Sequence, residues 1–197
     1  MKGLVMDTTL KVGFVSAFDG DREAVRYLAE FSTQSALIPA CRQVLADLDL
    51  SLTELDGVFA VVGPGSFTGI RIGVTFANAL CFARSLPRFS LSSFDLMQCV
   101  RPVAPAYAIA AGHGSYYAAF REGTALAERN AEESELPQGT IDQSTIIEEL
   151  PRGALLAARK ALEIKGISAC APTCETDYLK PNYMRKSQAE RLKDEKK

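Results

Sequence analysis

The sequence predicts an α/β fold with mixed β-sheets and flanking helices, arranged as two lobes of which the second is reduced. Three observations predict it. Strand patterns alternate with helical patterns over residues 1–100. A glycine-rich turn leads from one strand directly into a long apolar helix. A change in composition over Arg101–Pro105 then separates this first lobe from a second, expected over 101–180, and a basic tail follows over 181–197.

The first lobe begins with strand patterns over Gly3–Met6 and Val12–Phe18, joined by the turn Asp-Thr-Thr-Leu-Lys. A third strand is expected after the turn at Asp19–Asp21. Asp7 and Thr8 lie at the first bend, where such residues are typical of a hydrogen-bonded hairpin turn and less often of a phosphate loop. Both interpretations stay open on these residues alone.

Helices and strands then alternate. Apolar residues at three- and four-residue spacing predict a helix over Gln34–Leu48. Ser51 and Glu54 have the spacing of a capping box, and the run Gly57–Val62 after them predicts a buried strand. Beyond the glycine-rich turn and its helix, a short strand is expected over Arg88–Leu91.

The remaining segments are shorter or more polar. Ser92–Val100 predicts a capped helix, and Ala106–Phe120 predicts two strands joined by a Gly-His-Gly turn. The segment Glu122–Glu149 carries eight carboxylates against the lone Arg129, so we expect a solvated surface region. The tail Lys180–Lys197 has seven Lys or Arg against three Asp or Glu, and we expect it to fray.

Composition excludes several classes of function. A net charge of −2 does not suit a globally basic nucleic-acid surface. The apolar runs fall short of the ~18 residues of a membrane span, and no signal-peptide pattern precedes Asp7, so we expect a cytoplasmic protein without membrane contact. The single histidine, His113, leaves no His pair for a metal, so no metal ligand is predicted. The five cysteines are expected to be reduced thiols.

The segment Gly-Pro-Gly-Ser-Phe-Thr-Gly has two interpretations. It follows a strand and opens a helix, where backbone N–H groups can bind an anion. It lacks the lysine of a P-loop, with Arg71 as the nearest cation, and Thr68 stands where a dinucleotide-binding loop has its third glycine. Gly63 and Gly65 suit a tight turn, and Ser66 suits a helix N-cap. A sharp structural turn and an anion site are equally compatible with these residues.

The helix after this loop is apolar on most of its circumference. From Gly69 onward only Arg71, Thr75 and Asn78 are polar, and they form one narrow stripe. Small residues recur every four positions and form a small-residue stripe that allows close approach of another element. Its members are Gly69, Gly73, Ala77, Cys81 and Ser85. That element is either the chain's own sheet or, as we favour, a partner chain. The predicted interface residues are Leu37, Ile38, Cys41, Leu45, Gly69, Ile70, Gly73, Val74, Phe76, Ala77, Leu80 and Cys81.

These motifs identify a family. "GPGSFTGIRIGVTFANAL", together with the N-terminal "LVMDTT", resembles the bacterial TsaB family, also called YeaZ. The segments "SLTELDGVFAV", "SLSSFDLM" and "PNYMR" are supporting matches. The resemblance covers most of residues 1–100 and is thin over Ala106–Cys174.

The resemblance implies a two-lobed actin-like ATPase (ASKHA, ribonuclease H-like) fold that has lost its own catalysis, so no catalytic residue is expected. It implies a scaffold subunit that joins the catalytic subunit TsaD and the ATPase TsaE in adding threonylcarbamoyl to N6 of adenosine 37 of ANN-reading tRNAs. It further implies tRNA contact through the complex and pairing through first-lobe helices, a packing that also allows a homodimer in isolation. No cofactor is expected to bind tightly, although ATP or ADP is allowed at the partner interface. The residues that would face it, or form only a structural loop, are Asp7, Thr8, Gly63, Gly65, Ser66, Thr68 and Arg71.

The sequence departs from the family pattern at two places. Ala110 and Gly112, next to His113, stand where the family usually has an aspartate and an arginine. Thr33-Gln34-Ser35 replaces a usual His-Ser-Glu. Whether this second-lobe region or the tail Lys180–Lys197 touches tRNA is left open. The alternative function is a nucleotide-binding ATPase or kinase of the same superfamily that acts alone.

Overall fold

A five-stranded mixed sheet forms the centre of the first lobe. The computed structural model describes residues 1–28, 33–165 and 178–184. The strands are β1 (Lys2–Asp7), β2 (Phe14–Asp19), β3 (Arg22–Tyr27), β4 (Gly57–Val61) and β5 (Arg88–Leu91). Their order is β3-β2-β1-β4-β5, with β1 antiparallel to β2 and parallel to β4. The predicted strands of this lobe are therefore confirmed.

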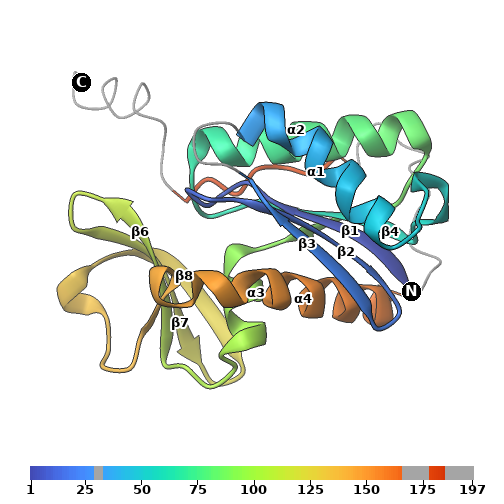
Figure 1. Cartoon of the computed structure of the whole chain (residues 1–197). Helices are drawn as coiled ribbons and strands as arrows, with labels where there is room; N and C mark the ends of the chain where they lie inside the picture. The colour runs from blue at the N-terminus through green and yellow to red at the C-terminus, as the bar shows by residue number, and fades with distance from the viewer. Residues whose placement is uncertain (29–32, 166–177, 185–197) are drawn as a thin grey trace.

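Helices cover both faces of this sheet (Figure 1). They are α1 (Thr33–Asp47), α2 (Phe67–Arg84), α3 (Ser93–Val100) and α4 (Leu150–Lys165). Side chains alternate across a strand, so Leu4 and Met6 of β1 pack in one cluster with α1 and α2, whereas Val5 packs with α3 and α4. The three helices predicted for residues 34–100 are confirmed, and the short 3₁₀ helix Leu52–Glu54 follows the predicted cap at Ser51.

A four-stranded sheet forms the second lobe. Its strands are β6 (Ala106–Gly112), β7 (Ser115–Glu122), β8 (Ala125–Glu132) and β9 (Ile141–Asp142), in the order β8-β7-β6-β9. The predicted strand pair β6 and β7 is confirmed, with His113 in the turn between them. Tyr107 of this sheet packs in the same cluster as Phe94 of α3 and Leu155 of α4, so the two lobes share a hydrophobic core.

The solvated surface expected over Glu122–Glu149 is confirmed by its exposure, although the segment also has regular structure that was not expected. The segment contains β8, β9 and two 3₁₀ helices (Glu133–Glu135 and Gln143–Glu149), and it buries Ala131 and Ile146. The strand β8 was not predicted because it is an edge strand, whose charged outer side stays in water while its backbone pairs with β7.

Three further features concern the rest of the chain. Cys41 and Cys81 are buried free thiols and Cys99 is a half-buried one, whereas Cys170 and Cys174 lie outside the described residues. Among the described helices, none is long and apolar enough to cross a membrane. Residues 178–184, which we call the C-terminal strap, run alongside α2 (Figure 1). Of the tail expected to fray, residues 181–184 belong to this strap, and the remainder lies outside the described residues.

Candidate functional site

The turn after β1 and the first turns of α2 interlock. The Thr8 hydroxyl donates a hydrogen bond to the Gly69 carbonyl at 2.6 Å, and the Ser66 N–H donates to the Thr9 carbonyl at 2.8 Å. A Cβ atom at Gly69 would lie 1.8 Å from the Thr8 carbonyl oxygen, and one at Gly73 would lie 2.3 Å from Oγ1 of Thr8. Because Gly69 and Gly73 of the small-residue stripe have no side chain, the turn after β1 can pack directly against the backbone of α2.

The glycine-rich turn is held from the other side by α3. The Ser93 N–H donates to the Gly63 carbonyl at 2.9 Å, and the Ser93 hydroxyl donates to the Pro64 carbonyl at 2.7 Å. Gly63 has φ +115°, a conformation that residues with a side chain rarely adopt. Gly65 lies directly against Thr9. The turn therefore joins β1, β4, α2 and α3 in one structural unit.

This closure limits what the α2 N-terminus can bind. The N–H groups of Ser66 and Gly69 are taken by the Thr9 carbonyl and by Oγ of Ser66. Asp7 and Thr8 are buried, whereas the side chains of Thr68 and Arg71 face solvent. The geometry favours the structural-turn interpretation, and an anion would have to meet the helix at its exposed rim.

The Asp7 carboxyl is fully buried beneath this turn. Its Oδ1 atom accepts hydrogen bonds from the Thr9 N–H at 2.8 Å and the Thr9 hydroxyl at 2.7 Å. Its Oδ2 atom has no hydrogen-bond partner among the described residues. Burial raises the pKa of Asp7 to about 6, and the two bonds from Thr9 oppose that shift. Asp7 therefore fixes the turn and does not face an open cleft.

The structure divides the twelve predicted interface residues into two groups. Nine are buried within the chain: Leu37, Cys41, Leu45, Gly69, Ile70, Gly73, Val74, Ala77 and Cys81. Ile38 is 49% exposed, and Phe76 and Leu80 are half-buried. Only these last three can touch a partner while the chain keeps this fold, so the small-residue stripe itself faces inward. An interface role for this region stays a prediction.

Apolar residues nonetheless lie on the outer side of α2, together with one exposed apolar residue of α1, Ile38. We call this surface the outer helix face, and its members are Ile38, Ile72, Phe76, Ala79, Leu80, Phe82 and Ala83. Phe82, which the sequence reasoning passed over, is 67% exposed. A helix that is apolar on both its buried and its exposed side is unusual for a surface helix. The outer helix face is therefore a candidate docking surface.

The C-terminal strap occupies the other flank of α2. The side-chain amide of Asn78 donates to the Leu179 carbonyl at 3.0 Å and accepts from the Leu179 N–H at 2.9 Å. The Arg71 guanidinium donates to the Tyr183 hydroxyl at 3.0 Å and stacks on Phe67. Two of the three residues of the polar stripe on α2, Arg71 and Asn78, thus contact the strap. Sequence reasoning missed this pairing, although "PNYMR" marked the segment.

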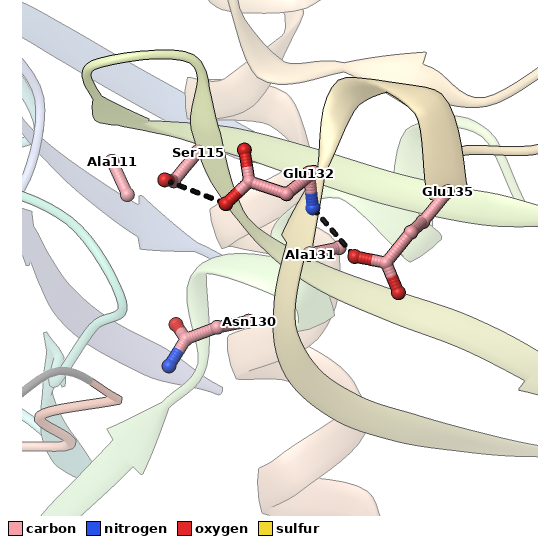
Figure 2. A pocket seen from close by; sticks show the side chains of 6 residues that line it. All are labelled: Ala111, Ser115, Asn130, Ala131, Glu132 and Glu135. Atoms are coloured by element: carbon pink, nitrogen blue, oxygen red, sulfur yellow. Dashed lines mark hydrogen bonds between the residues drawn. The ribbon is translucent and has the colours of Figure 1, made fainter.

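A hollow of about 260 Å³ lies beside β7 and β8 in the second lobe (Figure 2). It is lined by Ala111, Ser115, Asn130, Ala131, Glu132 and Glu135. Glu132 accepts a hydrogen bond from the Ser115 hydroxyl at 3.2 Å, and Glu135 accepts one from Arg129 at 2.6 Å. Both carboxylates are thus engaged by the chain. Within the ranges that the structure describes, no three His, Cys, Asp or Glu residues gather as a metal site.

The divergent second-lobe residues lie at the end of the β6–β7 hairpin. Ala110, Gly112 and His113 are exposed, and His113 has φ +56° in the turn. None of the three lines the hollow. Their role in contacting RNA stays open.

Comparison with known proteins agrees with this architecture. The family model described as "TsaD: tRNA N6-adenosine threonylcarbamoyltransferase" matches residues 28–134. The chain is 30% identical over 95 residues to the tRNA threonylcarbamoyladenosine biosynthesis protein TsaB of Haemophilus influenzae, covering 48% of this chain and 40% of that protein. It is 35% identical over 75 residues to TsaB of Bacillus subtilis, covering 38% of this chain and 32% of that one. The matched part thus spans less than half of these relatives.

Solved structures extend the similarity to the whole fold. A Pseudomonas aeruginosa protein with similarity to the peptidase YeaZ superposes with a TM-score of 0.70 at 18% identity, over 93% of this chain and 99% of that one. YeaZ from the same organism superposes with a TM-score of 0.66 at 18% identity, over 92% and 99%. The predicted two-lobed, actin-like α/β fold is confirmed.

Proposed function

Because the chain belongs to the TsaB, or YeaZ, family, within the wider family described as TsaD, we propose that it is a scaffold subunit in tRNA threonylcarbamoyladenosine synthesis. In this role it holds a TsaD-like catalytic subunit and, through the assembled complex, a TsaE-like ATPase and the tRNA. The subunit itself performs no chemistry. The complex adds threonylcarbamoyl to N6 of adenosine 37 of ANN-reading tRNAs.

The outer helix face carries this proposal. Ile38 on α1 and Phe82 on α2 expose 49% and 67% of their surface, and half-buried apolar residues lie between them on α2. Specific interfaces bury an apolar centre with aromatic anchors, which this face supplies. The same face allows the isolated chain to pair with a second copy.

The closed β1 turn supports a role without catalysis. A phosphate-binding turn needs donors that point to open space, whereas Thr8 and Thr9 are 2% and 4% exposed and bond within the chain. ATP or ADP at the partner interface would have to contact the exposed rim around Thr68 and Arg71.

The substitutions Ile38→Glu and Phe82→Glu are each expected to weaken binding of a TsaD-like subunit at least tenfold, because each puts a charge into an apolar contact. The measurement is a titration of labelled chain with the catalytic subunit. Leu156→Glu is the matched control, since Leu156 is 37% exposed on α4, across the sheet from α1 and α2. Equal binding by all three variants and the wild type would rule out the outer helix face as the interface.

The alternative, a nucleotide-dependent ATPase or kinase that acts alone, is tested by calorimetric titration of the isolated chain with Mg-ATP. We expect no heat of tight binding, because Asp7 and Thr8 are enclosed by α2 and α3. Micromolar binding that Asp7→Asn abolishes would favour the ATPase instead.

A further inference from the structure

The C-terminal strap connects elements that are distant in the sequence. It contacts α2 of the first lobe through Asn78 and Arg71, as described above. At its centre, the Asn182 N–H donates to the carbonyl of Val62, just beyond β4, at 2.8 Å. At its end, the Asn130 side chain of β8 donates to the Met184 carbonyl at 3.2 Å. Residues 178–184 therefore bridge the partner-binding helix and the outer strand of the second lobe.

The hydrogen bonds at the two ends differ in exposure. Leu179 packs against the small cluster of Val62, Ile70 and Val74, and its peptide N–H and C=O are both paired with one side chain. At the other end, the bond between Asn130 and Met184 is exposed to solvent, and the Met184 side chain packs, partly buried, against the main hydrophobic cluster. A short segment held in part by solvent-exposed hydrogen bonds opens locally at lower cost than the core elements do.

The position of Asn78 links the strap to the docking surface. Asn78 directly precedes Ala79 of the outer helix face, and Arg71 directly precedes Ile72 of the same face. A shift or rotation of α2 that breaks the bonds to Leu179 and Tyr183 must therefore move the outer helix face as well.

We propose that the C-terminal strap couples the second lobe to the outer helix face, so that strap docking and partner binding stabilise each other. The inference rests on the proposed partner role of that face. Linkage makes the coupling reciprocal, because a partner that binds the docked form more tightly must also favour docking. Asn78, Arg71 and Asn130 act as positioning residues that do not touch the partner.

Hydrogen exchange of the full chain tests the first half of the proposal. The N–H groups of Leu179 and Asn182 are bonded to Asn78 and Val62, so we expect both to exchange slowly in the isolated chain. Addition of the TsaD-like subunit is expected to slow the exchange of these two N–H groups about fivefold or more. Asn78→Ala should speed exchange at Leu179, whereas Gln138→Ala, an exposed amide in the second lobe, should not.

Partner affinity tests the second half. Asn130→Ala is the decisive variant, because Asn130 is exposed on β8, so its loss leaves the core intact. We expect it to weaken binding of the TsaD-like subunit about fivefold and to speed exchange at Leu179. Faster exchange with unchanged affinity in both Asn130→Ala and Asn78→Ala would overturn the coupling. Failure of the proposed function differs in kind, since the wild-type chain would then not bind the subunit at all.

Discussion

Replacing Gly69 with alanine is expected to destabilise the chain by roughly 3 kcal/mol. The added methyl group would lie 1.8 Å from the carbonyl oxygen of Thr8, a backbone atom that cannot rotate away. Relief requires α2 to move off the β1 turn, which breaks the 2.6 Å bond from the Thr8 hydroxyl to the Gly69 carbonyl. Urea unfolding followed by circular dichroism measures the loss.

Whether Gly69→Ala lowers or raises the free energy of unfolding distinguishes a packing clash from the effect of helix propensity. On an open helix, glycine to alanine would stabilise by about 1 kcal/mol. Gly73→Ala provides a graded comparison, because its methyl group would meet the Thr8 hydroxyl at 2.3 Å, and a side chain can turn aside at smaller cost. Ala79→Gly on the exposed side of α2 calibrates propensity alone. Stability of Gly69→Ala at or above the wild type would contradict the close approach.

Replacing Asp7 with asparagine is expected to stabilise the chain at pH 7 and to have little effect at pH 4. Burial raises the pKa of Asp7 to about 6 in the folded chain, above its ordinary value of 3.8. The folded state therefore holds the proton more tightly, so stability falls as pH rises from about 4 to 6 and stays reduced above that. The difference of about 2 pKa units corresponds to about 3 kcal/mol at pH 7. Asparagine keeps the oxygen that accepts from Thr9 and cannot ionise.

Urea titrations of both proteins at pH 4, 5, 6 and 7 measure this difference. Asp19→Asn is a control of opposite sign, because the bond from Arg22 lowers the pKa of Asp19, so that bond stabilises the wild type above the ordinary pKa and is lost in acid. Parallel pH profiles for wild type and Asp7→Asn would mean that another group neutralises the Asp7 charge.

Local patterns are sufficient to predict the first lobe. Short, largely apolar runs that are buried along their length define β1, β2 and β4, and the cap at Ser92 places the start of α3. Each of these signals lies within one segment and needs no knowledge of neighbours. The glycine-rich turn, with Ser66 as the N-cap of α2, belongs to the same class.

The second lobe is harder to predict from the sequence because its strands depend on pairing with segments elsewhere in the chain. Only pairing with β7 makes β8 a strand, since its charges leave no alternating pattern. α4 is different, because Leu150, Ala154, Leu155, Ala158 and Leu162 recur at helical spacing and are buried. That spacing is visible in the sequence alone, although no helix was predicted there.

The candidate site shows the same division. The sequence by itself determined that α2 is apolar on most of its circumference, that its small residues allow a close approach and that the loop Gly63–Gly69 lacks the lysine of a P-loop. It does not encode which way a helix faces, because rotation about the helix axis is fixed by what packs against it. Only the tertiary structure decided that Gly69 and Gly73 receive Thr8, that Asn78 receives the strap and that Phe82 faces outward. Residues distant in sequence contact Gly69, Gly73 and Asn78 of α2, and the outer helix face is the side that we propose binds another molecule.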